Sequence, residues 1–196
     1  MLAVVAINLY FSLPRLSRFS SVDEPYWTYD RTPDFWKAIS EFRWKGTNIN
    51  DKPGITVAAI SGIGLPWVDP MEYKSLRQKI KADDQLEEIR KINFSLRIPI
   101  YLVSLGMLFL FYFLIKKLLG QKTALLSFIL IGLSPILMGI SLIINPDSLL
   151  WMFLPVSILS FLVFQKEKSK KYLALTGFFL GLSLLTKYVA NILYVY

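Results

Sequence analysis

Four stretches in the second half of the chain contain no charged residue. They cover residues 98–115, 123–146, 148–165 and 172–186, and the last is followed by one lysine, Lys187, and then by more uncharged residues. A helix needs about 20 predominantly apolar residues to cross the hydrocarbon core of a bilayer. The pattern therefore predicts four membrane-spanning helices, the last of them with Lys187 near a membrane surface.

The chain also begins with an uncharged stretch, residues 1–14, which is too short to cross a core about 30 Å thick. It has no basic residue before it and no small-residue cleavage site after it, which argues against a signal peptide. We therefore expect a truncated first transmembrane helix at 1–14, an extracytoplasmic loop at 15–97, and transmembrane helices two to five at 98–196. Because the chain also stops inside an apolar stretch, we expect a fragment of a larger membrane protein.

Lysines are concentrated in the short loops between the predicted helices, at residues 116–122 and 165–171. Short Lys-rich loops face the cytoplasm in membrane proteins, and helix counting puts both loops on the same side. The long loop 15–97, the turn at Asp147 and the end of the last helix then share the outer face. The net charge of +8 thus follows from the topology of a multi-pass protein, which we expect in the plasma membrane, and gives no reason to expect nucleic acid as a partner.

The long loop has the patterns of helices that lie along a membrane surface. Residues 34–42 are amphipathic, with Trp36 on the apolar side, and Thr32 as N-cap and Pro33 in the first turn predict the helix start. Such a helix typically lies in the membrane interface, and packing on a soluble core is the alternative. Residues 55–67 are apolar but too few to span, which favours a juxtamembrane or re-entrant helix.

Residues 69–72 read Asp-Pro-Met-Glu, which has the form of a capping box and predicts another helix start. Apolar residues then recur at near-helical spacing up to Ile92 within a charged sequence. This pattern predicts a solvated helix pair that leads into the second transmembrane helix.

The composition restricts the chemistry of the protein. The chain contains no Cys and no His, which excludes a disulfide framework, a zinc site, a thiol nucleophile and an imidazole base. Acid–base chemistry must come from carboxylates, Lys or Tyr, and a bound metal would need oxygen ligands. The sequence describes an all-α polytopic membrane protein.

Ionisable residues near membrane-spanning segments are expensive and are therefore functional candidates. The predicted topology brings three carboxylates and two cations to one outer interface; they are Asp23, Glu24, Asp147, Arg97 and Lys187. Cations that hold an anionic lipid headgroup, beside carboxylates that act on a hydroxyl, are the chemistry that this set suits.

Each candidate also has a purely structural interpretation. Asp147 is placed to cap its helix, and the Asp23–Glu24 pair is placed to be solvated. Arg97 and Lys187 are placed to extend to the lipid headgroups, although the apolar residues around Lys187 make this less natural for it.

Six short motifs occur in the chain in a fixed order. They are Ser-Val-Asp-Glu-Pro-Tyr-Trp at 21–27, Pro-Gly-Ile-Thr at 53–56, Arg-Ile-Pro at 97–99, Lys-Lys-Leu-Leu-Gly at 116–120, Asn-Pro-Asp-Ser-Leu-Leu at 145–150 and Gly-Leu-Ser-Leu-Leu-Thr-Lys-Tyr at 181–188. The ordered set resembles the N-terminal part of the protein-mannosyltransferase-like glycosyltransferases. This group includes the dolichyl-phosphate-mannose protein mannosyltransferases and the bacterial lipid A aminoarabinose transferases.

The resemblance implies a GT-C-type transmembrane helix bundle whose first extracytoplasmic loop carries amphipathic juxtamembrane helices. It implies a hexosyl- or pentosyltransferase that moves a sugar from a polyprenyl-phosphate donor to a hydroxyl of an acceptor protein, lipid or glycan, with inversion, at the outer membrane face. By position, Asp23 would be the general base, Glu24 would orient it or help to bind acceptor or metal, and Asp147 would support the site. A divalent cation, Mg²⁺ or Mn²⁺, would use Asp23 and Asp147.

The resemblance also implies a binding site for the donor phosphate, with Lys187, Arg97 and Lys52 as its cations. Lys52 stands where many members of the family carry His before the Pro-Gly step. The family has about twice as many helices as we predict here, so we expect the donor and acceptor pockets to be completed by a part that this chain lacks.

Two other functions remain open at this stage. A non-catalytic membrane subunit with the same fold would keep its function when Asp23 is replaced by Asn. A transporter or flippase for a polyprenyl-linked glycan is the second alternative, although the second to fourth predicted helices carry no charge in their interiors, which argues against ion-coupled transport.

Overall fold

The computed structural model describes residues 1–49, 53–71 and 86–194, and it contains no strand within these ranges. Its regular elements are, in chain order, α1 (Leu2–Ser12), η1 (Leu13–Arg15), α2 (Glu24–Tyr26), η2 (Trp27–Arg31), α3 (Thr32–Ser40), η3 (Trp44–Thr47), α4 (Ile55–Ser61), η4 (Gly62–Trp67), α5 (Leu86–Leu119), α6 (Gln121–Gly132), α7 (Pro135–Ile140), α8 (Pro146–Glu167), α9 (Lys170–Thr186) and η7 (Tyr188–Tyr194).

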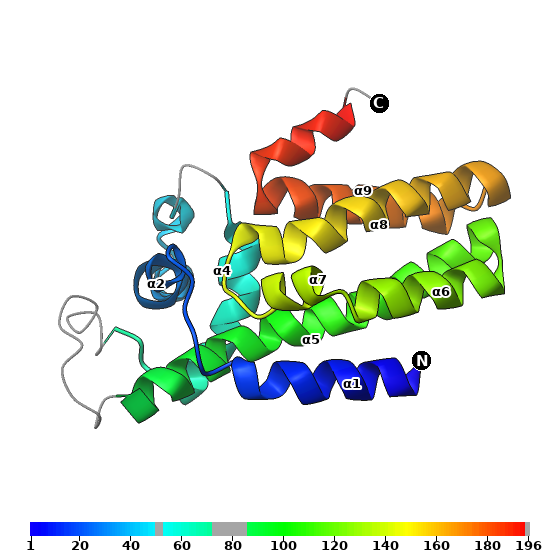
Figure 1. The fold of residues 1–196 in the computed structure, drawn as a ribbon. Coiled ribbons are helices and arrows are strands. Elements are labelled where there is room, and N and C mark those ends of the chain that lie inside the picture. The colour runs from blue at the N-terminus through cyan, green and yellow to red at the C-terminus, as the bar shows by residue number, and fades with distance from the viewer. Residues whose placement is uncertain (50–52, 72–85, 195–196) are drawn as a thin grey trace.

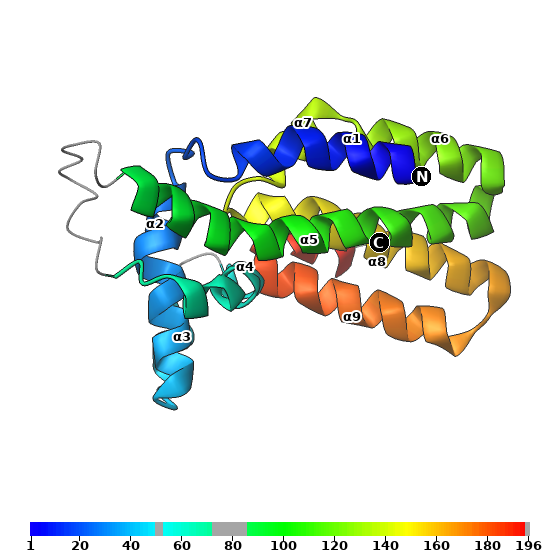
Figure 2. The same ribbon diagram turned by 90° about the horizontal axis from the view of Figure 1, so that it is seen from below.

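The long helices form a bundle, and the helices of the long loop gather at one end of it (Figure 1). The helices α1, α5, α6, α8 and α9 run roughly along one direction, whereas α2, α3 and α4 lie at the end where α1 stops and where α5 and α8 begin (Figures 1 and 2). Helix α9 ends at this same end of the bundle, which we call the loop end.

Helices α5 and α8 are long and apolar enough to cross a membrane. Half of the most apolar window of each is buried inside the bundle, which leaves the other half for contact with lipid or with further helices. Helix α5 contains the whole predicted second span and begins 12 residues before it, at Leu86.

The predicted third span, residues 123–146, differs from the structure. Helix α6 ends at Gly132, and a separate short helix, α7, begins at Pro135. Ser134 between them is extended, and its side chain accepts a bond from the backbone N–H of Leu137. Because proline has no N–H and cannot continue the hydrogen bonding of a helix, the uncharged stretch is broken into two helices, neither of which is long enough to span.

The two Lys-rich loops lie together at the end of the bundle opposite the loop end, as helix counting predicted. Lys117 Nζ forms an ion pair with Glu167 at 2.7 Å, and Lys166 Nζ donates to the Lys117 carbonyl at 2.7 Å. These contacts join the α5–α6 turn directly to the α8–α9 turn.

The amphipathic segment of the long loop is helical, but it begins before the predicted N-cap. Thr32 has helical backbone angles, is buried and makes no capping bond, because the π-helical turn η2 already precedes it. The prediction of Thr32 as N-cap is therefore wrong. The apolar side of α3 packs on protein: Phe35 and Ala38 are buried, and Trp36 Nε1 donates to the Ala58 carbonyl of α4 at 3.0 Å.

The apolar segment at 55–67 folds as α4 and η4 and packs against the first part of α5. Ser61 Oγ donates to the Leu96 carbonyl at 2.8 Å. At Gly62 an added Cβ would overlap the indole of Trp36, so only glycine allows this close packing against α3. Asp69 accepts a bond from the backbone N–H of Met71 at 2.9 Å, whereas the rest of the predicted capping box and helix pair up to residue 85 lies outside the described residues.

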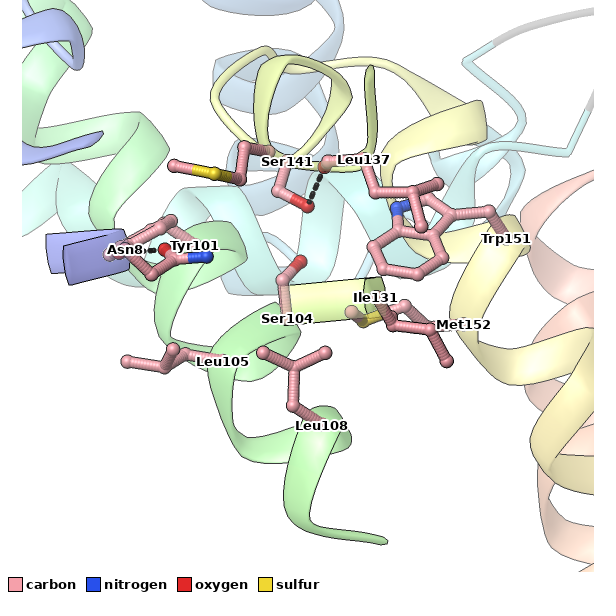
Figure 3. Close-up of a pocket in the computed structure, with 11 residues that line it drawn as sticks. Asn8, Tyr101, Ser104, Leu105, Leu108, Ile131, Leu137, Ser141, Trp151 and Met152 are labelled. Atoms are coloured by element: carbon pink, nitrogen blue, oxygen red, sulfur yellow. Dashed lines mark hydrogen bonds between the residues drawn. The ribbon is translucent and has the colours of Figure 1, made fainter. Parts of the chain in front are cut away.

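A small cavity with a mostly apolar lining lies between α1, α5, α7 and α8 (Figure 3). At its edge Tyr101 donates to Asn8 Oδ1 at 2.6 Å, and Asn8 donates to the Gly132 carbonyl at 2.6 Å, which ties α1 to α5 and α6. The cavity volume is about 20 Å³. This is enough for a water molecule but far too little for a sugar, so the cavity is not a substrate pocket.

Candidate active site at the loop end of the bundle

An ion pair between Asp147 and Lys187 lies at the loop end, where α8 begins and α9 ends. Lys187 Nζ is 2.7 Å from Asp147 Oδ1, and the two side chains are 28% and 45% exposed. Both groups are thus accessible from outside. Because an exposed pair of this kind contributes little to stability, its position is more informative than its energy.

The local structure explains why these two side chains meet. Asn145 is the N-cap of α8, and its side chain accepts the bond from the backbone N–H of Asp147 at 2.9 Å. The structural interpretation of Asp147 as the helix cap is therefore wrong. Its carboxylate is left to pair with Lys187. Lys187 itself follows the last residue of α9 in an extended conformation.

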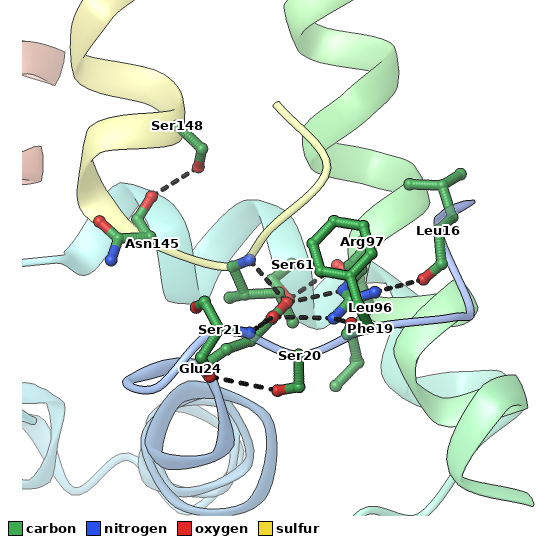
Figure 4. Close-up of polar contacts among 11 residues, drawn as sticks. Leu16, Phe19, Ser20, Ser21, Glu24, Ser61, Leu96, Arg97, Asn145 and Ser148 are labelled. Atoms are coloured by element: carbon green, nitrogen blue, oxygen red, sulfur yellow. Dashed lines mark hydrogen bonds and ion pairs between the residues drawn. The ribbon is translucent and has the colours of Figure 1, made fainter. Parts of the chain in front are cut away.

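Glu24 and Arg97 form a second ion pair, which is completely buried (Figure 4). The guanidinium donates from Nε to Glu24 Oε1 and from Nη2 to Glu24 Oε2, each at 2.7 Å. Neither side chain has any exposed surface. A two-bond pair of this kind fixes the relative position of its two backbones as well as neutralising both charges.

The Glu24 carboxylate also accepts two backbone bonds, from Ser21 N at 3.1 Å and from Ile144 N at 2.9 Å. Glu24 therefore joins the loop after α1 to α5 and to the turn that leads into α8. With four donors around it, the carboxylate has no free lone pair directed at a substrate. Of the two roles that the resemblance implies for Glu24, the binding of acceptor or metal does not fit this placement, whereas the positioning of Asp23 does.

Arg97 is likewise fully occupied. Besides Glu24, it donates to the Leu16 carbonyl at 2.7 Å and to the Phe19 carbonyl, and the ring of Phe19 lies 5.3 Å from the guanidinium carbon. A guanidinium enclosed in this way neither extends to the lipid headgroups nor reaches a donor phosphate. The structure thus places Arg97 with Glu24 as a clamp on the loop, in contrast to both of its sequence-based interpretations.

Asp23 has surroundings unlike those of its neighbour Glu24. It precedes α2 and is exposed, and it forms no hydrogen bond or ion pair with any residue in the described part of the chain. The buried clamp at Glu24 therefore holds an accessible carboxylate directly beside it. Glu24 also accepts a bond from the backbone N–H of Ile144, which lies three residues before Asp147. The segment that carries Asp23 is therefore attached to the turn that leads to Asp147.

The Pro-Gly-Ile-Thr motif is attached to the end of α9, beside Lys187. Gly54 N donates to the Thr186 carbonyl at 3.0 Å, and the hydroxyls of Thr56 and Thr186 are 2.6 Å apart. Gly54 has a positive φ of 61°, and an added Cβ would overlap the indole of Trp27. Lys52, the other predicted phosphate ligand, lies outside the described residues.

Tyr29 lies in the buried part of this region. Burial raises the pKa of its phenol above the usual value, the nearby Arg97 lowers it, and Glu24 raises it again. The net rise keeps Tyr29 protonated at neutral pH, so it does not offer a base.

Asp23 and Asp147 are the predicted ligands of a divalent cation. Among the described residues, no group of three or more acidic side chains is close enough together to hold a metal ion. The Glu24 carboxylate is engaged by Arg97 and two N–H groups, and Asp147 is paired with the ammonium of Lys187. The use of Asp23 and Asp147 by Mg²⁺ or Mn²⁺, which the resemblance implies, stays a prediction.

An open pocket of about 370 Å³ lies next to Lys187, between the long loop and the end of α9. Its lining combines apolar and hydrogen-bonding side chains, contributed by Thr47, Asn48, Pro53, Ile55, Leu184, Leu185, Tyr188 and Asn191. Its size lies in the range of small-molecule sites.

Sequence reasoning missed the contacts that assemble this end of the bundle. It did not find the bond between Thr56 and Thr186 or the binding of Ile144 N by Glu24, because both join residues more than 100 positions apart. Two local signals were present: the Pro-Gly step before Thr56, and a threonine directly before the candidate Lys187.

The fold and this site define an all-helical membrane protein with charged groups gathered at one end of a helix bundle. A sequence model of the dolichyl-phosphate-mannose-protein mannosyltransferase family matches residues 89–196, more than half of the chain. The chain belongs to this family and is a membrane glycosyltransferase. No curated protein and no solved structure matches the chain.

Proposed function

We propose that the protein transfers one sugar from a polyprenyl-phosphate donor to an acceptor hydroxyl, at the outer face of the membrane and with inversion at the anomeric carbon. The Asp147–Lys187 pair is the observation that carries the proposal. It places an accessible cation beside a carboxylate, at the end of the bundle that also carries Asp23.

The chemical step is a single displacement. The acceptor oxygen forms a bond to the anomeric carbon while the bond from that carbon to the donor phosphate oxygen breaks. The hydroxyl proton passes to the Asp23 carboxylate, and the electron pair of the broken bond leaves with the polyprenyl phosphate. One displacement with one base gives inversion.

Lys187 neutralises the phosphate as it leaves, and Lys52 assists it. A phosphate leaving group needs charge neutralisation rather than protonation, and an ammonium can provide this. Asp147 orients Lys187 through the 2.7 Å contact between them. When the donor phosphate binds, Lys187 exchanges part of this contact for the phosphate oxygens.

The distribution of lysines supports the outer face as the location of this site, and the nature of the donor supports a position at the membrane boundary. The Lys-rich turns lie together at the opposite end of the bundle, joined by the contact between Lys117 and Glu167, and such turns face the cytoplasm. A site at the membrane boundary also suits a donor whose carrier is a long apolar chain.

The proposal predicts that Asp23→Asn abolishes transfer while the protein still folds. Asn has nearly the same shape but cannot take up the proton, so we expect transfer to fall by about 10²–10⁴-fold, the usual contribution of a general base. The measurement is transfer from radiolabelled polyprenyl-phosphate sugars, with the mannosyl donor first, by membranes that contain the complete gene product.

Asp34→Asn is the matched control, because Asp34 is an exposed carboxylate of the same loop in α3. Normal transfer by Asp23→Asn at equal expression would contradict the assignment of the base. If the unchanged protein also showed no transfer with any donor while supporting the function of a partner, the non-catalytic subunit would be the correct alternative.

A further inference from the structure

An apolar cleft of about 560 Å³ lies on the side of the bundle formed by α1, α6 and α7. Most of its lining is apolar and includes Ile7, Phe11, Leu133 and Met138. Arg15 is the one charged residue among the side chains that line it. The volume lies within the range of sites that bind small organic molecules.

The break between α6 and α7 creates this cleft. Before the break, α1 is in close contact with α6: Asn8 donates to the Gly132 carbonyl at 2.6 Å, and a Cβ at Gly132 would lie only 2.8 Å from Val4 Cγ1. After Gly132 the chain leaves the helical path at Pro135 and α7 follows a different course. Helices α1 and α7 form the two walls of the cleft and therefore diverge towards the loop end. Their side chains line the space between them.

Arg15 gives the cleft a polar end. It lies in η1, just after α1, one residue before Leu16, whose carbonyl binds the buried Arg97. Its Nη1 donates to the Phe11 carbonyl and its guanidinium carbon lies 5.8 Å from the ring of Phe11. The side chain is exposed, and its Nε and Nη2 groups form no hydrogen bond or ion pair with the described part of the chain. An apolar space with a cation at one end complements a lipid in both shape and charge.

We propose that this cleft binds an anionic phospholipid of the surrounding bilayer. One acyl chain lies between α1 and α7, and the phosphate group accepts bonds from the Arg15 guanidinium. Planar guanidinium groups bind phosphate through paired, charge-assisted bonds. Arg18, which is also exposed and lies three residues further along, adds positive charge that favours a lipid with net negative charge.

The occupant is a bilayer lipid and not the sugar donor, because the cleft and Lys187, the proposed ligand of the donor phosphate, lie on different sides of α5. Helices α1, α6 and α7 lie on one side of α5, and α9 lies on the other (Figure 2). A phosphate on Arg15 is therefore held away from Lys187, which follows α9. The bound lipid fills the gap beside α1 and stabilises its packing.

Residues 1–196 contain no cysteine, so a direct test needs only the replacement by serine of any cysteine elsewhere in the complete gene product. In the complete gene product, Gly139→Cys places a thiol in the cleft, and Gly177→Cys places one on α9; an added Cβ meets nothing within 4 Å at either position. Each variant is labelled with bimane and reconstituted into phosphatidylcholine that contains an increasing fraction of brominated phosphatidylglycerol, which quenches the fluorophore on contact.

We expect the label at position 139 to be quenched at a fraction of brominated lipid about tenfold lower than the label at 177, which meets only the general lipid environment. Arg15→Gln should remove this preference, because a charge-assisted bond contributes about this factor, whereas Lys122→Gln at the opposite end of the bundle should not. Equal quenching at both positions, or a preference that survives Arg15→Gln, would overturn the proposal.

Two further outcomes identify a different occupant and would also overturn it. Absence of quenching at 139 even in fully brominated lipid would mean that protein covers the cleft. Relief of quenching by polyprenyl phosphate at an equal mole fraction would mean that the sugar donor binds there.

Discussion

Two adjacent carboxylates of one short motif have opposite surroundings. Glu24 is completely buried and accepts four bonds, whereas Asp23 is exposed and has no bonding partner within the described residues. The loss of one partner of a buried ion pair strongly destabilises the folded protein, because the other charge is then left without compensation in a medium of low polarity. At the scale of single residues, the motif thus contains one group suited to chemistry and one that holds it in place.

We expect Glu24→Gln to destabilise the protein by about 3–5 kcal/mol, the usual cost of leaving one charge of a buried pair uncompensated. The free energy of unfolding in detergent, from a denaturant titration, measures this. Asp23→Asn changes an exposed side chain and should alter it by less than about 0.5 kcal/mol. If both variants were equally stable, Glu24 would not be the clamp that its contacts with Arg97 indicate.

At the scale of elements, the loop helices are held to the bundle by close backbone contacts that larger residues would prevent. The start of α4 lies against the ring of Trp27 in η2, and its Gly54 binds the end of α9 through the Thr186 carbonyl. Lys187 directly follows Thr186, so its position depends on how closely the start of α4 approaches Trp27 and the end of α9.

Gly54→Ala should destabilise the protein by about 1–3 kcal/mol, because its φ of 61° is unfavourable for alanine and the added Cβ would overlap Trp27. The midpoint of thermal unfolding is the measurement. Gly177→Ala is the control, since it lies inside α9 with open space around it and should be stabilised by about 0.5–1 kcal/mol. A neutral Gly54→Ala would contradict the close packing of α4 on Trp27.

At the scale of the whole molecule, charges are divided between the two ends of the bundle. One end carries the Lys-rich turns, and the other carries the loop helices and the Asp147–Lys187 pair. If the positive turns face the cytoplasm, the long loop lies outside.

This topology predicts different labelling of two single-cysteine variants in intact cells. Lys45→Cys in η3 and Lys122→Cys in the first turn of α6 are both at exposed positions, and residues 1–196 contain no other cysteine. A membrane-impermeant maleimide should label Lys45→Cys directly and Lys122→Cys only after permeabilisation. The reverse pattern would place the proposed active site in the cytoplasm.

The sequence predicted much of the site but assigned some roles differently from the structure. The uncharged stretches gave helices α5, α8 and α9, and helix counting correctly brought the two Lys-rich turns together. The grouping of Asp147 with Lys187 is also present in the structure. Arg97 could not be assigned correctly, because a cation at the start of a span has the same sequence pattern whether it extends to lipid or is buried by a distant carboxylate.

The sequence by itself determined that this chain is a helical membrane protein and which few charged residues lie near its surface, because the cost of charge in hydrocarbon is a local property that shows directly in the order of residues. Only the tertiary structure decided which charges neutralise one another. Glu24 pairs with Arg97 and Asp147 with Lys187 through contacts between residues 73 and 40 positions apart. Such pairing depends on how the helices pack, and the pattern of a single helix contains no information about its neighbours.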